Sequence, residues 1–239
     1  MATPSTPLSK SSGLSEPLVN RFTGTERAVH WTYATFFLLL LATGLTMELP
    51  FLSVLVPDRG VLRQAHVASA FFFVVGPALV AMLGDWRAIR SIARQFDQWD
   101  DDERRWFSDI WNGFGTRAGK FNAGQKANAV FTVGSAILFV VSGLIMLSNV
   151  YGRVFPLWLV SNASFVHDTL TWMALLAWVG HIFLATVYPS TRPALRGMVT
   201  GKVRAAWARE HHPKWYDEIS GGAPEETPRV VSPEETMDP

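Results

Sequence analysis

The stretch HDTLTWMALLAWVGH, residues 167–181, begins and ends with histidine and decides how the chain is expected to fold. Asp168 is its one charged residue when histidine is taken as neutral, and the remainder is mostly apolar. Such a composition is typical of a helix in lipid, where a titratable side chain usually has a function. The two imidazoles therefore indicate a functional role inside a membrane.

Four stretches of the chain are apolar enough to cross a bilayer, which takes about 20 residues of helix. Of the 239 residues 49% are hydrophobic and only 17% are charged, compared with about 25% charged residues in soluble domains. We predict spans at about 28–49, 64–84, 125–151 and 164–190. The fold class is thus an all-α integral membrane protein, a four-transmembrane-helix bundle within one domain, residues 21–219.

Three further segments are expected to lie outside the bundle. Residues 154–163, before the last span, are predicted to form an interfacial loop or a short amphipathic piece. The tails 1–20 and 220–239 are polar and rich in proline, and we predict that both are disordered. The first tail has no apolar region of the kind found in a signal peptide.

The distribution of lysine and arginine predicts the orientation. The chain has 21 lysines and arginines, and all except Arg59, Arg63 and Arg153 lie in three regions. These are the segment before or at the start of the first span, the segment from the end of the second span to the start of the third, and the segment after the fourth span. Basic residues collect on the cytoplasmic side, so both termini are predicted to be cytoplasmic. A net charge of +1 gives no support for nucleic acid as a partner. The lack of cysteine excludes disulfides, cysteine-ligated clusters and covalently attached haem.

Four of the six histidines lie in the predicted spans and sort into two pairs by depth. His66 and His167 begin their spans at the outer face. His30 begins the first span at the cytoplasmic face. His181 follows His167 by 14 residues, about 21 Å along a helix, which places it at the depth of His30. The two rings on the fourth span differ by about 40° around the helix axis, so they point to nearly the same side.

Two bis-histidine haem b groups stacked across the membrane need this arrangement, because each iron takes one imidazole from each of two facing helices. We predict that His66 and His167 ligate an outer haem iron, and that His30 and His181 ligate an inner one. A lone intramembrane histidine has other uses, as a hydrogen-bond partner of a neighbouring helix or as part of a proton or transport pathway. Zinc is less favoured, because its usual site gathers four ligands.

Two arginines accompany these histidines. Arg27 precedes His30 by three residues, and Arg63 precedes His66 by three, so each shares a helix face with its histidine. Either guanidinium could bind a haem propionate at the membrane boundary. The alternative is a basic residue that extends from a span end towards water.

The polar stretch KFNAGQKAN, residues 120–128, opens the third span. Asn122 and Gln125 have the spacing of a capping box. Free amides at a helix start, with these side chains, could also receive a quinone oxygen, and the two roles are compatible. The acidic run Asp100–Glu103 is expected to be a solvated surface.

At this point the sequence resembles a known family, the gamma subunit of membrane-bound respiratory formate dehydrogenase, which is a di-haem cytochrome b. The resemblance is carried by RAVHW (27–31), LRQAH (62–66), KFNAGQK (120–126), the stretch 167–181, and GMVTGKVRAAWAREHHPKWYDEI (197–219). Segment 85–119 carries no motif that we can align with that family. His211 and His212 fall in the last motif but outside the membrane, and are not assigned to iron.

The resemblance implies both haem ligand pairs and a quinone site bordered by Asn122, Gly124, Gln125 and His181. It also implies an iron–sulfur beta subunit, a molybdenum or tungsten pterin alpha subunit, and a trimer of such units. The chain itself would pass electrons to quinone and do no formate chemistry. Two rivals are the cytochrome b subunit of a nickel–iron hydrogenase or other molybdoenzyme, and a haem-free membrane anchor or transporter.

Overall fold

The computed structural model describes residues 16–56, 58–109 and 117–221, so residues 1–15 and 222–239 of the predicted tails lie outside the described residues. The described elements, in chain order, are β1 (Leu18–Asn20), α1 (Gly24–Glu48), α2 (Pro50–Ser53), α3 (Arg59–Leu83), α4 (Trp86–Asp97), α5 (Asp101–Asp109), α6 (Ala123–Tyr151), α7 (Leu157–Ile182), the π-helix η2 (Phe183–Val187), α8 (Pro193–Thr200), β2 (Lys202–Arg204), α9 (Ala205–His211) and α10 (Pro213–Ser220).

Four of these helices are long and apolar enough to span a membrane: α1, α3, α6, and α7 together with η2. The last one differs from the sequence prediction, because it begins at Leu157 and not near residue 164. Pro156 accounts for this early start. Its extended backbone precedes the helix, and its carbonyl accepts from the amides of Leu159 and Val160. Residues 157–163 are therefore the first turns of α7 and not a loop.

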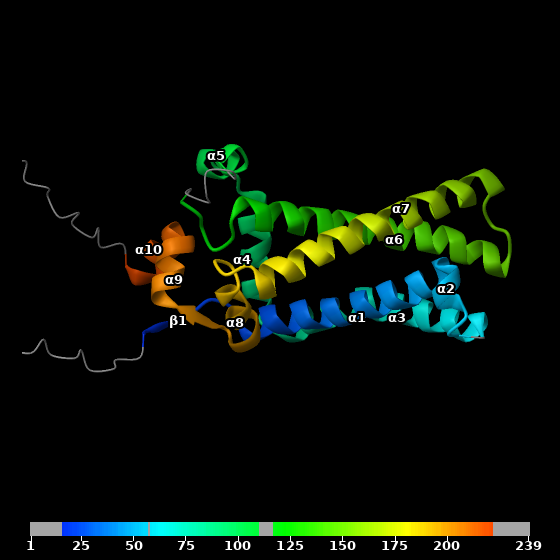
Figure 1. Ribbon diagram of the computed structural model, residues 1–239, viewed down its shortest axis with the longest axis horizontal. Coiled ribbons are helices and arrows are strands. Elements are labelled where there is room, and N and C mark those ends of the chain that lie inside the picture. The colour runs from blue at the N-terminus through cyan, green and yellow to red at the C-terminus, as the bar shows by residue number, and fades with distance from the viewer. Residues whose placement is uncertain (1–15, 57, 110–116, 222–239) are drawn as a thin grey trace, which may run out of the picture.

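The long helices form two pairs, with α1 packed along α3 and α6 packed along α7 (Figure 1). In α3, Gly76 permits a close approach to α1, since a Cβ atom there would lie 2.9 Å from Cγ2 of Thr32. The outward surface of the pairs is apolar, and Leu83 and Leu176 are 87% and 75% exposed. Side chains of this kind at such exposure are suited to lipid and not to water.

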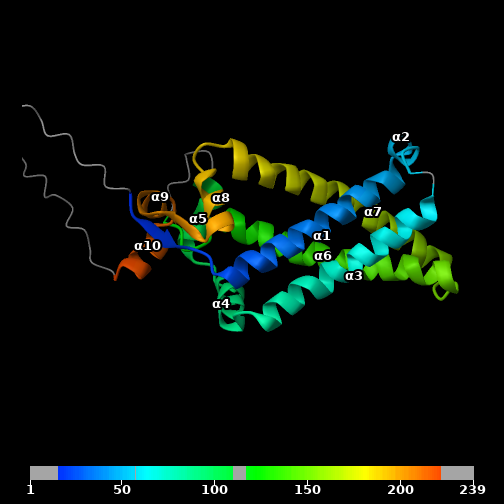
Figure 2. The same ribbon diagram turned by 90° about the horizontal axis from the view of Figure 1, so that it is seen from below.

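A small module joins the two ends of the described chain. Strand β1 pairs antiparallel with β2, Leu18 opposite Arg204 and Asn20 opposite Lys202. Beside the strands, α9 and α10 enclose a core of Val203, Trp207, Ala208 and Trp215. We call β1, β2, α9 and α10 the terminal module. It lies at one end of the helix pairs, and α2 lies at the other (Figures 1 and 2).

The starts of α1, α3 and α6 are fixed by side-chain caps, whereas α7 starts after Pro156 without one. Thr23 and Glu26 form a reciprocal capping box at the start of α1, and the Asp58 carboxylate accepts two amides at the start of α3. Both caps satisfy amides that have no partner within the helix. In the fold, α1 and α6 begin at the end where the terminal module lies, and α3 and α7 begin at the α2 end (Figure 1).

Candidate functional site

Towards the α2 end, His66 of α3 and His167 of α7 lie side by side, with ring centroids 6.4 Å apart and ring planes at 59°. Each ring is held by a hydroxyl from the neighbouring helix of its own pair. Nδ1 of His66 lies 2.8 Å from Oγ1 of Thr43, and Nδ1 of His167 lies 2.9 Å from Oγ of Ser142. Since Nδ1 is occupied on both rings, Nε2 is the nitrogen left for a ligand.

Near the terminal module, His30 of α1 and His181 of α7 form a second pair at the same separation. Their ring centroids are also 6.4 Å apart, with planes at 47°. The rings of Trp31 and His30 are nearly perpendicular, with 5.1 Å between their centroids. The Nδ1 atom of His30 is buried and, within the described ranges, has no hydrogen-bond partner.

Both separations fit one metal between two imidazoles. An imidazole nitrogen binds a transition metal at about 2 Å and lies about 1 Å from its ring centre, so rings on opposite sides of one ion have centroids about 6 Å apart. Within the part of the chain that the structure describes, no three His, Asp or Glu side chains come together at one point. Each pair therefore offers two imidazole ligands, the number that a bis-histidine haem iron takes from the protein.

The two arginines predicted to bind propionates have different surroundings. Nη1 of Arg27 donates to the carbonyl of Val199 at 2.7 Å, while its Nε is buried with no partner among the described residues. Arg63 is exposed and lines an open hollow with Phe71 and Tyr151. Arg27 thus retains donor capacity beside the inner pair, whereas Arg63 is on the surface.

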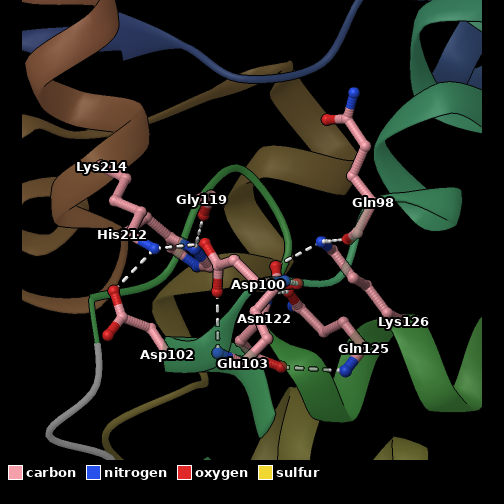
Figure 3. Close-up of polar contacts among 10 residues, drawn as sticks. All are labelled: Gln98, Asp100, Asp102, Glu103, Gly119, Asn122, Gln125, Lys126, His212 and Lys214. Atoms are coloured by element: carbon pink, nitrogen blue, oxygen red, sulfur yellow. Dashed lines mark hydrogen bonds and ion pairs between the residues drawn. The ribbon is translucent and has the colours of Figure 1, made fainter.

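The polar turn at the start of α6 forms the capping box that its spacing predicts (Figure 3). Oδ1 of Asn122 accepts the amide of Gln125 at 2.9 Å, and Oε1 of Gln125 accepts the amide of Asn122 at 3.0 Å. The cap uses the oxygens of both side chains, so their NH2 groups are the donors available to an acceptor. The turn lies at the same end of the molecule as His30 and His181.

Helix α5 covers this turn. The Trp106 ring packs on Gly124, where a Cβ atom would lie 2.6 Å from the ring. Beside it, Nζ of Lys126 pairs with the Glu103 carboxylate and donates to the carbonyl of Gln98 at 2.7 Å (Figure 3). Lys126 and Glu103 are only 5% and 7% exposed.

The acidic run was expected to be solvated, and this is wrong for Glu103, because Lys126 neutralises it inside the α5–α6 contact. Asp100 and Asp102 both pair with Lys214 of α10, which ties α5 to the terminal module. The hydrogen bond from Lys214 holds the pKa of Asp100 below its usual value. Asp100, Asp102 and Glu103 are therefore structural contacts between elements, whereas Asp101 is exposed and pairs with Arg104 of its own helix.

Beneath the terminal module, Arg21 is 3% exposed and donates to Nε2 of His212 and to the carbonyl of Lys120, both at 2.9 Å. Burial lowers the pKa of Arg21 to about 9. Burial first, and the Arg21 charge second, lower the pKa of His212 to about 3. His212 is therefore a neutral acceptor. Its Nδ1 donates to the carbonyl of Gly119 at 2.8 Å, so it is a structural residue.

Sequence reasoning did not find Thr43 and Ser142. A signal for them exists, because each hydroxyl residue is followed by Gly-Leu at matching positions of two spans, 43–45 and 142–144. Only the folded arrangement brings each one to a histidine that is 23 or 25 residues away.

Comparison with known proteins identifies the family. A family model described as prokaryotic cytochrome b561 matches residues 21–201. The nitrate-inducible formate dehydrogenase cytochrome b556(Fdn) subunit of Escherichia coli K12 is 26% identical over 200 residues, which is 81% of this chain and 88% of that protein. The formate dehydrogenase cytochrome b556(fdo) subunit of the same strain is 28% identical over 200 residues, covering 83% and 92%. The formate dehydrogenase cytochrome b556 subunit of Haemophilus influenzae is 32% identical over 101 residues, 42% of this chain and 41% of that protein.

Proposed function

The chain belongs to the prokaryotic cytochrome b561 family, and on this basis we propose that it is the membrane-anchoring cytochrome b subunit of a formate dehydrogenase complex in the bacterial inner membrane. Membership of a cytochrome b family implies haem b and electron transport. The formate dehydrogenase assignment rests on the names of its relatives over most of the chain.

The observation that carries the proposal is the pair of equal ring separations, 6.4 Å for His66 with His167 and 6.4 Å for His30 with His181. We assign His66 and His167 to an outer haem b, and His30 and His181 to an inner one. Bound haem supplies one-electron carriers, so two of them would connect the two sides of the membrane. Arg27, whose Nε has no hydrogen-bond partner among the described residues, is the better candidate for a propionate than the exposed Arg63.

The terminal module would be on the cytoplasmic side, and both ends of the chain with it, because the basic residues gather there. Quinone would bind at this end, beside His181 and the start of α6. A quinone carbonyl accepts hydrogen bonds, and the side-chain NH2 groups of Asn122 and Gln125 can donate them. The Trp106 ring packs on Gly124 of this turn, so that ring would border the bound quinone.

The overall reaction balances across the membrane. Oxidation of formate to carbon dioxide outside releases two electrons and one proton. Reduction of quinone to quinol takes up two electrons and two protons from the cytoplasmic side. The partners would be an iron–sulfur beta subunit that delivers the electrons and a molybdenum or tungsten pterin alpha subunit that oxidises formate. A trimer of such units is a prediction from the resemblance.

The test uses the complex purified from its native membrane, with His66→Ala in this chain. We expect that formate no longer reduces quinone, while formate oxidation with a soluble electron acceptor is retained. His211→Ala, in the terminal module, is the matched control and should leave both activities intact. If quinone reduction survives in the His66→Ala complex, the proposed electron path is wrong. If the wild-type complex shows no absorption bands of reduced haem b, the proposed function is wrong, and the chain is a haem-free anchor or transporter.

A further inference from the structure

Two hydroxyl residues hold the outer histidines in the same way, although they lie on different helices. Thr43 of α1 is bonded to Nδ1 of His66, and Ser142 of α6 is bonded to Nδ1 of His167. The next residue is glycine in both cases, Gly44 and Gly143, and its ideal Cβ position lies 3.5 Å from Cε1 of the same ring. The backbone of α1 and that of α6 therefore meet the edges of the two rings alike.

The direction of these hydrogen bonds follows from the other contacts of the hydroxyls. Oγ1 of Thr43 donates its single proton to the carbonyl of Leu39 at 2.7 Å. Oγ of Ser142 donates its proton to the carbonyl of Leu138 at 2.7 Å. A hydroxyl has one proton and two lone pairs, so each oxygen is left to accept from the histidine. Both outer rings thus carry hydrogen on Nδ1 and present the lone pair of Nε2.

The inner pair lacks this feature at one of its rings. Nδ1 of His30 is buried and, among the residues that the structure describes, bonds to nothing. The two pairs have the same ring separation, so they differ in what lies behind the imidazole and not in the gap between the rings.

We infer that Thr43 and Ser142 are positioning residues that set the reduction potential of the outer haem, an inference that rests on the proposed function. By accepting the Nδ1 hydrogen they fix the tautomer and the ring orientation of His66 and His167. They also increase the basicity of Nε2, as acceptors behind metal-bound histidines do. A more basic axial ligand favours ferric over ferrous iron, so the two hydroxyls lower the potential of that haem.

The experiment measures both haem potentials in the purified complex by potentiometry followed with absorption spectra. Thr43→Val and Ser142→Ala remove the acceptor with little change of volume. We expect two haems per chain, a positive shift of the outer haem potential in each variant, a larger shift in the double variant, and an unchanged inner haem. Thr43→Ser and Ser142→Thr keep the hydroxyl and should restore the wild-type value. His66→Ala and His30→Ala identify which potential belongs to which haem.

Two matched controls come from the same helices. The hydroxyls of Thr46 and Ser148 donate to helix carbonyls, those of Ala42 and Ile145, and not to a histidine of the described chain. Thr46→Val and Ser148→Ala should leave both potentials unchanged. An equal shift in these controls would mean that the effect comes from loss of a helix hydroxyl in general, and would overturn the inference.

The remaining outcomes separate the inference from the function on which it rests. If both haems bind and neither potential moves in Thr43→Val and Ser142→Ala, the inference is wrong and the haem assignment stands. If Thr43→Val loses the outer haem and Thr43→Ser keeps it, the positioning role is supported. If Thr43→Val and Thr43→Ser both lose the outer haem, the loss does not come from removal of the hydroxyl. If the wild-type chain has no haem, the proposed function fails first.

Discussion

His167 and His181 lie on one helix, α7, yet each faces a histidine from a different helix, His66 of α3 and His30 of α1. Because the α-helix between them is continuous, their 14-residue spacing corresponds to about 21 Å of rise. Helix α7 is thus the element that sets the distance between the two candidate haem levels, and the other two helices supply one ring to each level.

This pairing predicts how histidine variants combine. Any single change to alanine among the four histidines should lower the haem content from two to one per chain, because one axial ligand of one iron is lost. His66→Ala with His167→Ala removes ligands of the same iron, so the double variant should still retain one haem. The double variant His66→Ala with His181→Ala removes one ligand from each of the two irons, so it should retain no haem. Haem per chain is measured by the pyridine haemochrome assay.

The two double variants are controls for each other, since both lose two imidazoles. Equal haem content in the two would contradict the assignment of ligands to levels. A non-specific effect of the substitutions on folding would lower both to the same extent.

Gly124→Ala tests the contact between α5 and the start of α6. A Cβ atom at this position would lie 2.6 Å from the Trp106 ring, which must move. We expect a loss of about 1–3 kcal/mol of stability, the usual cost of overpacking, and a higher KM for quinone, because the same turn borders the proposed site. Thermal unfolding in detergent and quinone-dependent turnover of the complex measure the two effects.

The control for this variant is Gly134→Ala in the same helix, where nothing lies within 4 Å of the new Cβ. It should melt like the wild type. Shortening the ring with Trp106→Leu should recover much of the stability lost in Gly124→Ala. Identical melting of Gly124→Ala and Gly134→Ala would mean that α5 does not pack on the turn.

His212 should make the terminal module sensitive to acid. Its pKa is lowered from the ordinary 6.5 to about 3 in the folded protein, chiefly by burial. Between these values the unfolded state binds more protons than the folded state, so stability is full above pH 6.5 and is lost as the pH falls. The limit is about a tenfold change in the opening equilibrium per pH unit. Hydrogen exchange of α9 and α10 between pH 6.5 and 5 measures it.

Comparison with variants at each pH removes the intrinsic pH dependence of exchange. His212→Gln keeps an acceptor for Arg21 but does not titrate, so its protection should stay level across this window. The His211 ring is stacked on Trp207 nearer the surface. The His211→Gln variant should keep the wild-type dependence of exchange protection on pH. A slope in His212→Gln equal to that of the wild type would assign the acid sensitivity to another group.

The helical architecture was predictable because apolar length is a strong signal, and four helices of the required length and hydropathy are present. The depth order of the histidines followed from their places along the spans, and the ring distances agree with it. Iron ligation and the quinone site stay predictions. The early start of α7 was missed because Leu157 and Trp158 follow Pro156 in a stretch that also reads as an interfacial loop.

What the sequence could not indicate depends on contacts between distant residues. Glu103 belongs to an acidic run, and only its partner Lys126 shows that it is buried. The roles of His212 and Arg21 depend on a contact across 191 residues. Thr43 and Ser142 are ordinary span hydroxyls until the packing of α1 on α3 and of α6 on α7 brings a ring to each. The local sequence pattern predicts the depth of a residue in the membrane and the helix face on which it lies. It does not predict which residue of the next helix the side chain contacts.

The pairing of β1 with β2 also has a consequence for biosynthesis. The ribosome produces Leu18–Asn20 before the four long helices and Lys202–Arg204 after them, so the first strand cannot pair until the second has been made. An odd number of inserted helices would leave the two strands on opposite faces of the bilayer, unable to meet. The two strands can therefore pair only when an even number of helices has crossed the membrane, which places both strands on the same side.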